Sequence, residues 1–359
     1  MTIRGRGRSP IVCAVAAFAL SGCSAVEFYW QGFNGQIDLL SRAKPIAEVI
    51  ETTPDPALKL HLVRAQSIRA FASHDLALPD NRSYTNYADL GRPFVLWNVF
   101  AAPELSLTPR QWCFPVAGCV AYRGYFAADD ARAEAARIKA AGDDVHLGGV
   151  PAYSTLGYFD DPVLSTFVRY REAELARLIF HELAHQVVYV KDDTAFNESF
   201  AVAVEEEGVA RWLAAEAMRR PAAQVAEIAA DMERGQRSRA GFRAMIASAR
   251  DRLSALYAGT ASDTEKRAGK AAVFAEMRAE NERRKAASDG TSTFDRWFAA
   301  GANNAGIAAA GLYADRVPQF KALLDQENGD LSRFYDRVKA LAALPKAERD
   351  QALAGASRG

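Results

Sequence analysis

One stretch of this sequence restricts the fold more than any other. Residues 175–208 read LARLIFHELAHQVVYVKDDTAFNESFAVAVEEEG and contain the pattern H-E-x-x-H at residues 181–185. Residues four apart lie on the same face of a helix, so His181 and His185 can direct both imidazoles to one metal ion. Glu182 lies about 100° further around the helix, which places its carboxylate beside the metal and near a metal-bound water.

A hydrolytic zinc site uses three protein ligands and leaves the fourth position to water. We expect Glu198 to be the third ligand, because the chain can turn at residues 191–194 and return as an antiparallel helix. Glu205 lies two turns further along this helix, where it can orient a zinc histidine through the other ring nitrogen. The pattern alone also fits two histidines packed in an amphipathic helix. The helix-forming context and Glu198 favour the zinc site.

Two resemblances follow from these residues. The segment Asn197-Glu198-Ser199-Phe200-Ala201 resembles the N-E-G-F-A element that carries the third zinc ligand of gluzincin aminopeptidases, although the spacing from the histidines is shorter here. The whole mature chain resembles the bacterial "putative aminopeptidase" lipoproteins. Four stretches carry this second resemblance. They are the segment that begins with residues 112–115 and ends with residues 124–126, residues 152–157, the stretch 175–208 described above, and residues 303–305.

The resemblance implies further site residues. In gluzincin-like folds the edge strand of a sheet before the zinc helix borders the cleft, where an extended peptide can add as one more strand. By this analogy Ala152, Tyr153 and Ser154 bind substrate; the alternative is that their segment is an internal strand of the sheet. Tyr153 or Tyr158 could donate a hydrogen bond to the developing oxyanion. Tyr313 could do so instead, as a late tyrosine does in gluzincin aminopeptidases.

The beginning of the sequence predicts export. Three arginines at positions 4, 6 and 8 precede an apolar run over residues 11–20, which is too short to span a bilayer as a stable helix. The following Leu20-Ser21-Gly22-Cys23 resembles a bacterial lipobox, in which the cysteine is lipidated and becomes the N-terminus. An ordinary secretory signal is the alternative. Residue 24 is Ser and not Asp, which under the sorting rule of enteric bacteria favours the outer membrane, facing the periplasm.

The predicted organisation is therefore a signal peptide at residues 1–22, a lipidated N-terminus and spacer at 23–35, and a zinc metallopeptidase domain at 36–359. The partners implied are a peptide substrate and a membrane. The 44 basic and 44 acidic side chains balance, which argues against nucleic acid as a partner.

Two cysteines remain for the mature domain, Cys113 and Cys119. An exported protein folds in an oxidising compartment, so we expect a local disulfide. A second metal site is the alternative, and the absence of a nearby histidine in the sequence disfavours it.

The fold class that we predict is α+β and predominantly helical, with a small sheet before the zinc helix and a helical C-terminal half. Strands are expected at residues 94–100, 120–126, 145–150 and 152–156. Helices are expected at 37–51, 57–78, 127–141, 196–217, 221–233, 238–258, 264–287, 303–313, 316–326 and 330–342.

The function predicted is zinc-dependent hydrolysis of peptide bonds at the cell envelope, with Glu182 as general base. The resemblance favours an aminopeptidase. The alternatives are an envelope endopeptidase with the same chemistry, or a non-enzymatic zinc-binding lipoprotein. Glu182 has no use in a purely structural zinc site, which argues against the last alternative.

Overall fold

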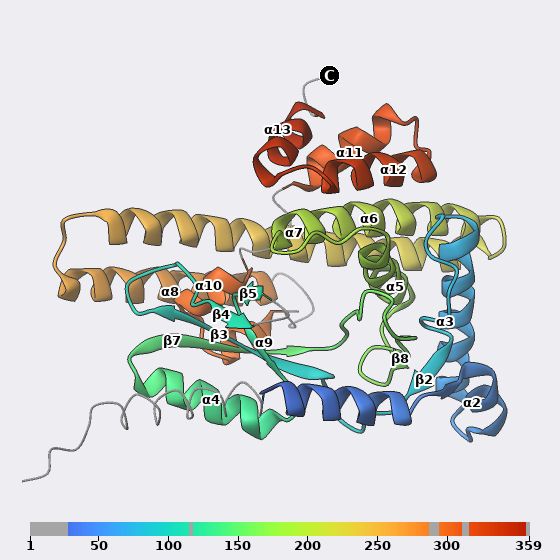
Figure 1. The fold of residues 1–359 in the computed structure, drawn as a ribbon, viewed down its shortest axis with the longest axis horizontal. Coiled ribbons are helices and arrows are strands. Elements are labelled where there is room, and N and C mark those ends of the chain that lie inside the picture. The colour runs from blue at the N-terminus through green and yellow to red at the C-terminus, as the bar shows by residue number, and fades with distance from the viewer. Residues whose placement is uncertain (1–27, 115–117, 287–293, 311–315, 357–359) are drawn as a thin grey trace, which may run out of the picture.

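The computed structural model describes residues 28–114, 118–286, 294–310 and 316–356. The chain is mostly helical with small sheets, so the predicted fold class is confirmed (Figure 1). The signal peptide, Cys23 and Tyr313 lie outside the described residues. No helix of the described residues combines the length and the hydrophobicity needed to cross a bilayer.

The largest sheet is antiparallel and has the strand order β6-β3-β7. Strand β3 (Leu96–Pro103) lies in the centre, between β6 (Arg123–Tyr125) and β7 (Asp143–Val150). Its side chains alternate between the two faces. Val99 packs with residues of helix α4 (Ala128–Ala140), whereas Phe100 packs with residues of helix α10 (Asn304–Ala310).

Two smaller sheets complete the β structure. Strands β1 (Lys44–Pro45), β2 (Asn86–Ala88) and β8 (Val163–Leu164) form one of them. Strands β4 (Trp112–Phe114) and β5 (Gly118–Val120) form the other, in which Cys113 pairs with Cys119. These two cysteines are joined by a disulfide bond, as predicted.

Helices α5 (Glu172–Val187) and α6 (Thr194–Ala217) form an antiparallel hairpin in the main core. The segment between them ends at Asp193, whose carboxylate caps α6 by accepting a hydrogen bond from the backbone N–H of Phe196. Phe180, Phe196 and Phe200 are fully buried in this core. The hairpin is the element that carries the H-E-x-x-H pattern.

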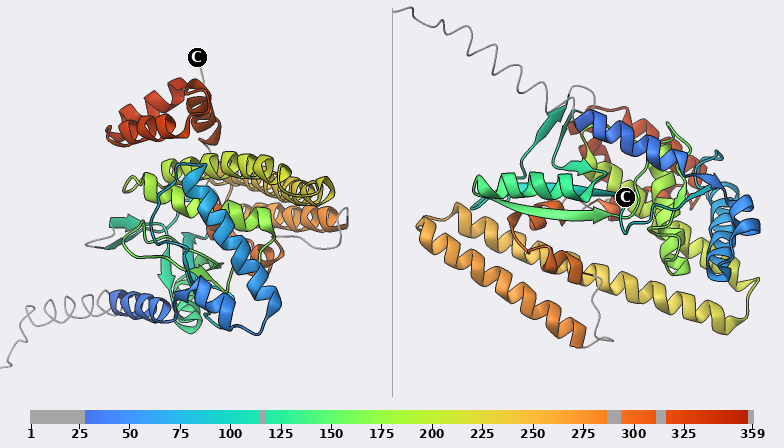
Figure 2. Two further views of the ribbon diagram at one scale, coloured as in Figure 1. Left: turned by 90° about the vertical axis from the view of Figure 1, so that its right-hand side faces the viewer. Right: turned by 90° about the horizontal axis from the view of Figure 1, so that it is seen from below.

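Further helices complete the fold (Figures 1 and 2). They are α2 (Ile46–Thr52) and α3 (Pro56–His74), the long pair α7 (Ala222–Ala258) and α8 (Asp263–Ala286), the short α9 (Asp295–Ala299), and the C-terminal α11 (Val317–Gln326), α12 (Leu331–Ala342) and α13 (Lys346–Ala356). Helix α11 packs on α6 through Phe320, which contacts Phe196 and Phe200. Helix α13 was not predicted.

The strand predicted at residues 152–156 is wrong. These residues form a loop, because Leu156 has a φ of 58° and Gly157 a φ of 83°, values that an extended strand does not adopt. Asp161 fixes the loop by accepting hydrogen bonds from the backbone N–H of Thr155 at 2.9 Å and from its hydroxyl at 2.8 Å.

Three other boundaries differ from the predictions. The helix predicted at 37–51 is divided into two helices. Residues 28–41 form the first, which begins within the expected spacer, and α2 is the second. The strand predicted at 120–126 is divided between β5 and β6. The helices predicted at 221–233 and 238–258 are one continuous helix, α7.

Candidate metal centre

The two histidines of the H-E-x-x-H pattern converge as helix geometry predicts. His181 and His185 both lie on α5, and their Nε2 atoms are 3.2 Å apart. His185 is buried at 8% exposure, and His181 is partly buried. Burial lowers the pKa of His185 to about 4, so its imidazole is neutral near pH 7, as a metal ligand requires.

Helix α6 brings Glu198 to the same point. One carboxylate oxygen of Glu198 lies 3.3 Å from His181 Nε2, and the other lies 3.6 Å from His185 Nε2. The preceding residue, Asn197, fixes the entry of this helix: its side chain accepts a hydrogen bond from the backbone N–H of Val190 and donates one to the Val190 carbonyl, both at 2.8 Å.

The distances fit a tetrahedral zinc ion. With metal–ligand bonds of about 2.0–2.1 Å, the ligand atoms of a tetrahedral site lie about 3.3 Å from one another. His181 Nε2 lies 3.2 Å from His185 Nε2 and 3.3 Å from one Glu198 oxygen, both close to this value, whereas the 3.6 Å contact of His185 Nε2 is with the other Glu198 oxygen. One ligand atom from each residue can be chosen so that all three lie within 4.8 Å of one another. Two imidazoles and one carboxylate form a donor set typical of hydrolytic zinc sites. Among the described residues, this is the only cluster of three such side chains that could hold a metal ion.

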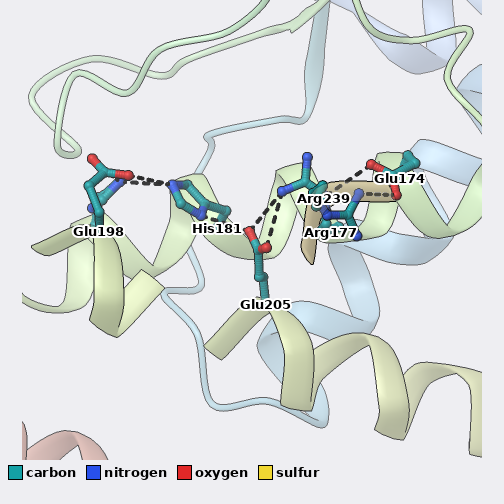
Figure 3. Close-up of polar contacts among 7 residues, drawn as sticks. Glu174, Arg177, His181, Glu198, Glu205 and Arg239 are labelled. Atoms are coloured by element: carbon teal, nitrogen blue, oxygen red, sulfur yellow. Dashed lines mark hydrogen bonds and ion pairs between the residues drawn. The ribbon is translucent and has the colours of Figure 1, made fainter. Parts of the chain in front are cut away.

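Glu205 supports the centre from α6, at the position that the sequence predicted. Its carboxylate lies 2.8 Å from His181 Nδ1, so it can accept a hydrogen bond from the Nδ1–H of this imidazole and orient the ring with Nε2 toward Glu198. Arg177 donates two hydrogen bonds to Glu205, at 3.0 and 3.1 Å. Glu174 accepts hydrogen bonds from Arg177 and from Arg239 of α7 (Figure 3). A chain of charged groups therefore connects the candidate metal centre to a third helix.

The same contacts govern the basicity of His181. Burial alone would lower the pKa of this imidazole, but the hydrogen bonds with Glu198 and Glu205 raise it to about 10. An imidazole oriented between two carboxylates is a strong electron-pair donor, and a metal ion competes with the proton for its Nε2.

Glu182 is buried at 8% exposure on the same helix. The pKa of its carboxyl is raised to about 7: burial is the largest cause, the charge of His181 opposes it, and the charges of Glu198 and Asp161 add to it. A carboxyl with a pKa near neutrality suits a group that must accept a proton and then release it.

The residues that were assigned to substrate binding do not form a strand edge. Ala152 is buried in the main core, and the Ser154 hydroxyl accepts a hydrogen bond from the backbone N–H of Leu156. Tyr153 packs its ring edge-to-face on Phe126, with 6.0 Å between ring centroids, and burial raises the pKa of its hydroxyl. It lines a cavity of about 10 Å³ together with Tyr84 and Asp161.

Three tyrosines that sequence reasoning missed lie near the charged groups of the site. The Tyr189 ring lies 6.4 Å from the His185 ring, and this side chain is 54% exposed. The charge of Glu198 contributes to raising the pKa values of Tyr189 and Tyr122, although burial is the larger cause for both. The Tyr84 hydroxyl is buried and has no hydrogen-bond partner among the described residues; burial and then the charge of Glu182 raise its pKa.

Only one of these three had a signal in the sequence. Tyr189 follows His185 by four residues, which keeps it close to the second histidine even though α5 ends at Val187. Tyr84 and Tyr122 come from separate loops, and only the tertiary fold brings them to the site.

Comparison with known families identifies the family of the chain. A model of the family described as "putative aminopeptidase" matches residues 27–353, and the chain belongs to this family. The family points to peptidase activity and to a peptide substrate. No curated protein and no solved structure is significantly similar to the chain.

Proposed function

We propose that this member of the putative aminopeptidase family is a zinc-dependent aminopeptidase of the bacterial cell envelope. The observation that carries the proposal is the convergence of His181, His185 and Glu198 beside a buried carboxylate, Glu182. A structural zinc site would take a fourth protein ligand and would not need a carboxylate of raised pKa.

In this proposal each side chain has a separate task. His181, His185 and Glu198 hold zinc, which when bound polarises the scissile carbonyl and lowers the pKa of a bound water. Glu182 accepts the proton of the attacking water and delivers it to the leaving amine. Glu205 holds the His181 ring in the tautomer that presents Nε2 to the centre.

Tyr189 is our candidate for the hydrogen-bond donor to the oxyanion. It lies beside His185 and is half-exposed, so its hydroxyl can reach a substrate. Tyr153 is held by Phe126, and the charges that act on its hydroxyl are those of Asp161 and Arg92. The role of Tyr313 stays a prediction from the sequence.

The substrate edge must also be reassigned. Strand β7 is an edge strand of the main sheet and continues directly into the loop at residues 151–162. An extended peptide can add to such an edge through main-chain hydrogen bonds. We assign substrate pairing to the end of β7, with the loop around Tyr153 and Ser154 as its continuation.

Matched peptides with free and acetylated N-termini test the activity. We expect the soluble form, residues 24–359, to release N-terminal residues from the free peptides only, and a chelator to abolish the release. Replacing Glu182 by Gln should lower turnover by about 10²–10⁴-fold, because the proton acceptor is lost. Zinc content, measured by mass spectrometry, should stay at one ion per chain, because Glu182 is not a ligand.

The other outcomes each refute a part of the proposal. Cleavage of both peptide sets would make the protein an endopeptidase. Loss of zinc from the Glu182→Gln variant would refute its role as general base. No cleavage of either set by the zinc-bound protein would refute the peptidase function.

The envelope location rests on the lipobox. We propose that Cys23 carries the lipid anchor, on the outer membrane facing the periplasm. Labelling with radioactive palmitate should mark the full chain and leave the Cys23→Ser variant unmarked. Equal labelling of the two chains would refute the anchor.

A further inference from the structure

The first described helix, residues 28–41, exposes a stripe of large apolar side chains. Trp30 is 64% exposed, Phe33 59% and Ile37 49%. Their spacing of three and four residues puts them on one face of the helix. Trp30 and Phe33 stack on each other, with ring centroids 6.3 Å apart. Burying these side chains in an apolar environment would be favourable, so the exposed stripe indicates an interaction surface.

The opposite face holds this helix firmly on the protein. Gln31 donates a hydrogen bond to the carbonyl of Gly124 and accepts one from the backbone N–H of Phe126, both at 3.1 Å. Leu39 is buried at 2% exposure in the main core. The stripe therefore belongs to a helix with a fixed orientation.

The chemistry of the stripe fits a phospholipid surface. Tryptophan and other aromatic side chains favour the boundary between lipid headgroups and acyl chains. The charged residues of the segment from 28 to 42 are Asp38 and Arg42, which pair with each other. Attraction to charged headgroups would therefore contribute little, and apolar burial would dominate.

The position of the stripe in the chain indicates the same partner. The lipobox Cys23 lies five residues before Phe28, and five residues span at most about 18 Å. A lipid on Cys23 would keep the stripe next to the bilayer. A second copy of the chain fits less well, because a stable interface takes about 20–30 residues from each partner and this stripe offers three.

We propose that the face of helix 28–41 formed by Trp30, Phe33 and Ile37 inserts into the interface of a phospholipid bilayer and sets the orientation of the enzyme on the membrane. The proposal rests on the envelope location proposed above, because the lipid anchor delivers the helix to the bilayer.

The structure gives this orientation a consequence for the candidate site. Leu39 of the helix lines the same small cavity as Tyr84, Tyr153 and Asp161, so the helix packs directly beneath the loop at residues 151–162. Helix 28–41 and α4 lie at one end of the molecule, and α11, α12 and α13 lie at the other (Figures 1 and 2). A bilayer at the first end would lie next to the loop and away from the C-terminal helices.

Vesicle binding of the non-lipidated form, residues 24–359, tests the helix without the anchor. We expect it to sediment with vesicles of phosphatidylethanolamine and phosphatidylglycerol, with little change between low and high salt. The partition coefficient of the double variant Trp30→Ser/Phe33→Ser should be lower by a factor of about ten or more, because this variant loses both aromatic side chains. The matched control is Leu60→Ser/Val63→Ser, a pair with the same spacing on α3 and exposures of 51% and 50%, which should bind like the wild type.

Brominated lipids add a local readout. They should quench part of the tryptophan fluorescence of the wild type. The Trp30→Phe variant should still bind but lose this quenching, because Trp30 is the inserted fluorophore.

The opposing outcomes are distinct. Absence of wild-type binding at millimolar lipid, or equal binding by the wild type and the Trp30→Ser/Phe33→Ser variant, would overturn the proposal. So would a concentration-dependent dimer that this variant abolishes, because the stripe would then bind a second copy. Hydrolysis of soluble peptides should be unchanged in all these variants, so a failure of the peptidase proposal would leave the vesicle result unaffected.

Discussion

The hairpins α5–α6 and α7–α8 are both antiparallel helix pairs, but they use polar residues in opposite ways. Eleven of the sixteen residues of α5 are buried, against three of the 37 residues of α7. In the first hairpin the charged residues Glu182 and Glu205 lie inside the core. In the second, ion pairs such as Arg252–Glu276 lie on the surface, with both side chains about half-exposed.

The difference shows what burial does for a site. A carboxylate in water has a pKa near its ordinary value and many orientations, whereas a buried one is held by named partners and is shifted by them. Glu205 is fixed between His181 and Arg177, and the surroundings of Glu182 raise its pKa to about 7. The α5–α6 hairpin can therefore support chemistry, while the charges of α7–α8 mainly keep a long exposed helix pair soluble and helical.

The largest effect on stability and metal binding is expected when Glu205 loses its charge. The Glu205→Gln variant should bind zinc about 10–100-fold more weakly, because the orienting partner of His181 is weakened. It should also unfold more easily, since Arg177 keeps a buried charge with less compensation. Competition with a chromogenic chelator measures the first effect, and thermal unfolding without metal measures the second.

The matched control lies on the other hairpin. Glu276 also pairs with an arginine, Arg252 at 2.6 Å, but on the surface. The Glu276→Gln variant should change neither zinc affinity nor the unfolding temperature measurably. If Glu205→Gln and Glu276→Gln had equal effects, the burial of Glu205 would give it no special part in zinc binding or stability.

A buried imidazole extends the comparison to the sheet. His146 of β7 is 5% exposed, contacts the rings of Phe100 and Trp297, and has no hydrogen-bond partner for its Nδ1 among the described residues. Burial lowers its pKa to about 4 from an ordinary value of 6.5. The folded protein therefore disfavours the protonated form, which the unfolded chain takes up more readily.

The sign of the pH dependence follows from this shift. The contribution of neutral His146 to stability is complete above pH 6.5 and is lost as the pH falls from 6.5 toward 4, by up to about 3 kcal/mol. The His146→Leu variant should lose less stability over this window than the wild type. Denaturant unfolding at pH 7 and pH 5 measures the difference, and parallel losses in both proteins would contradict the assignment.

Glycines in the two hairpins give a smaller, structural test. A Cβ added at Gly208 of α6 would lie 2.8 Å from side-chain carbons of both Leu76 and Phe180, which are fully buried. We expect Gly208→Ala to lower the free energy of unfolding by about 1–3 kcal/mol, because this core cannot move to make room. Zinc affinity should also fall, since Phe180 precedes His181. Unchanged stability and affinity would show that the core at this point is adaptable.

The convergence of the candidate metal ligands could be predicted because local geometry places them. The i, i+4 spacing brings His181 and His185 together, and the two-turn spacing aligns Glu198 with Glu205 on one helix face. The start of the helix predicted at 303–313 is likewise set by a local contact, since the Asn303 side chain accepts a hydrogen bond from the backbone N–H of Gly306. Such predictions need only one element or one turn.

The errors occurred where tertiary contacts override local preference. Residues 152–156 contain Tyr, Thr and Leu and were expected to extend, but Asp161 and a left-handed Leu156 fold them into a loop. Gly235 lies between the two helices predicted at 221–258 and does not interrupt α7, because a glycine within a helix costs only about 1 kcal/mol. Tyr84 and Tyr122 approach the site from loops that no periodicity connects to α5.

The smallest effect is expected at Gly241 of α7, and it has the opposite sign to Gly208. A Cβ at this position would meet the guanidinium tip of Arg284, a side chain of α8 that is 45% exposed and can turn away. Alanine favours a helix over glycine by up to about 1 kcal/mol, so Gly241→Ala should raise the free energy of unfolding by about 0.5 kcal/mol after Arg284 is displaced. Chemical denaturation of the wild type and the variant measures this gain.

The same substitution in an Arg284→Ala background should give a larger gain, because the obstruction is gone. A loss of stability in both backgrounds would mean that α7 and α8 pack there as tightly as α5 and α6 do. The same core constraint would then govern both hairpins.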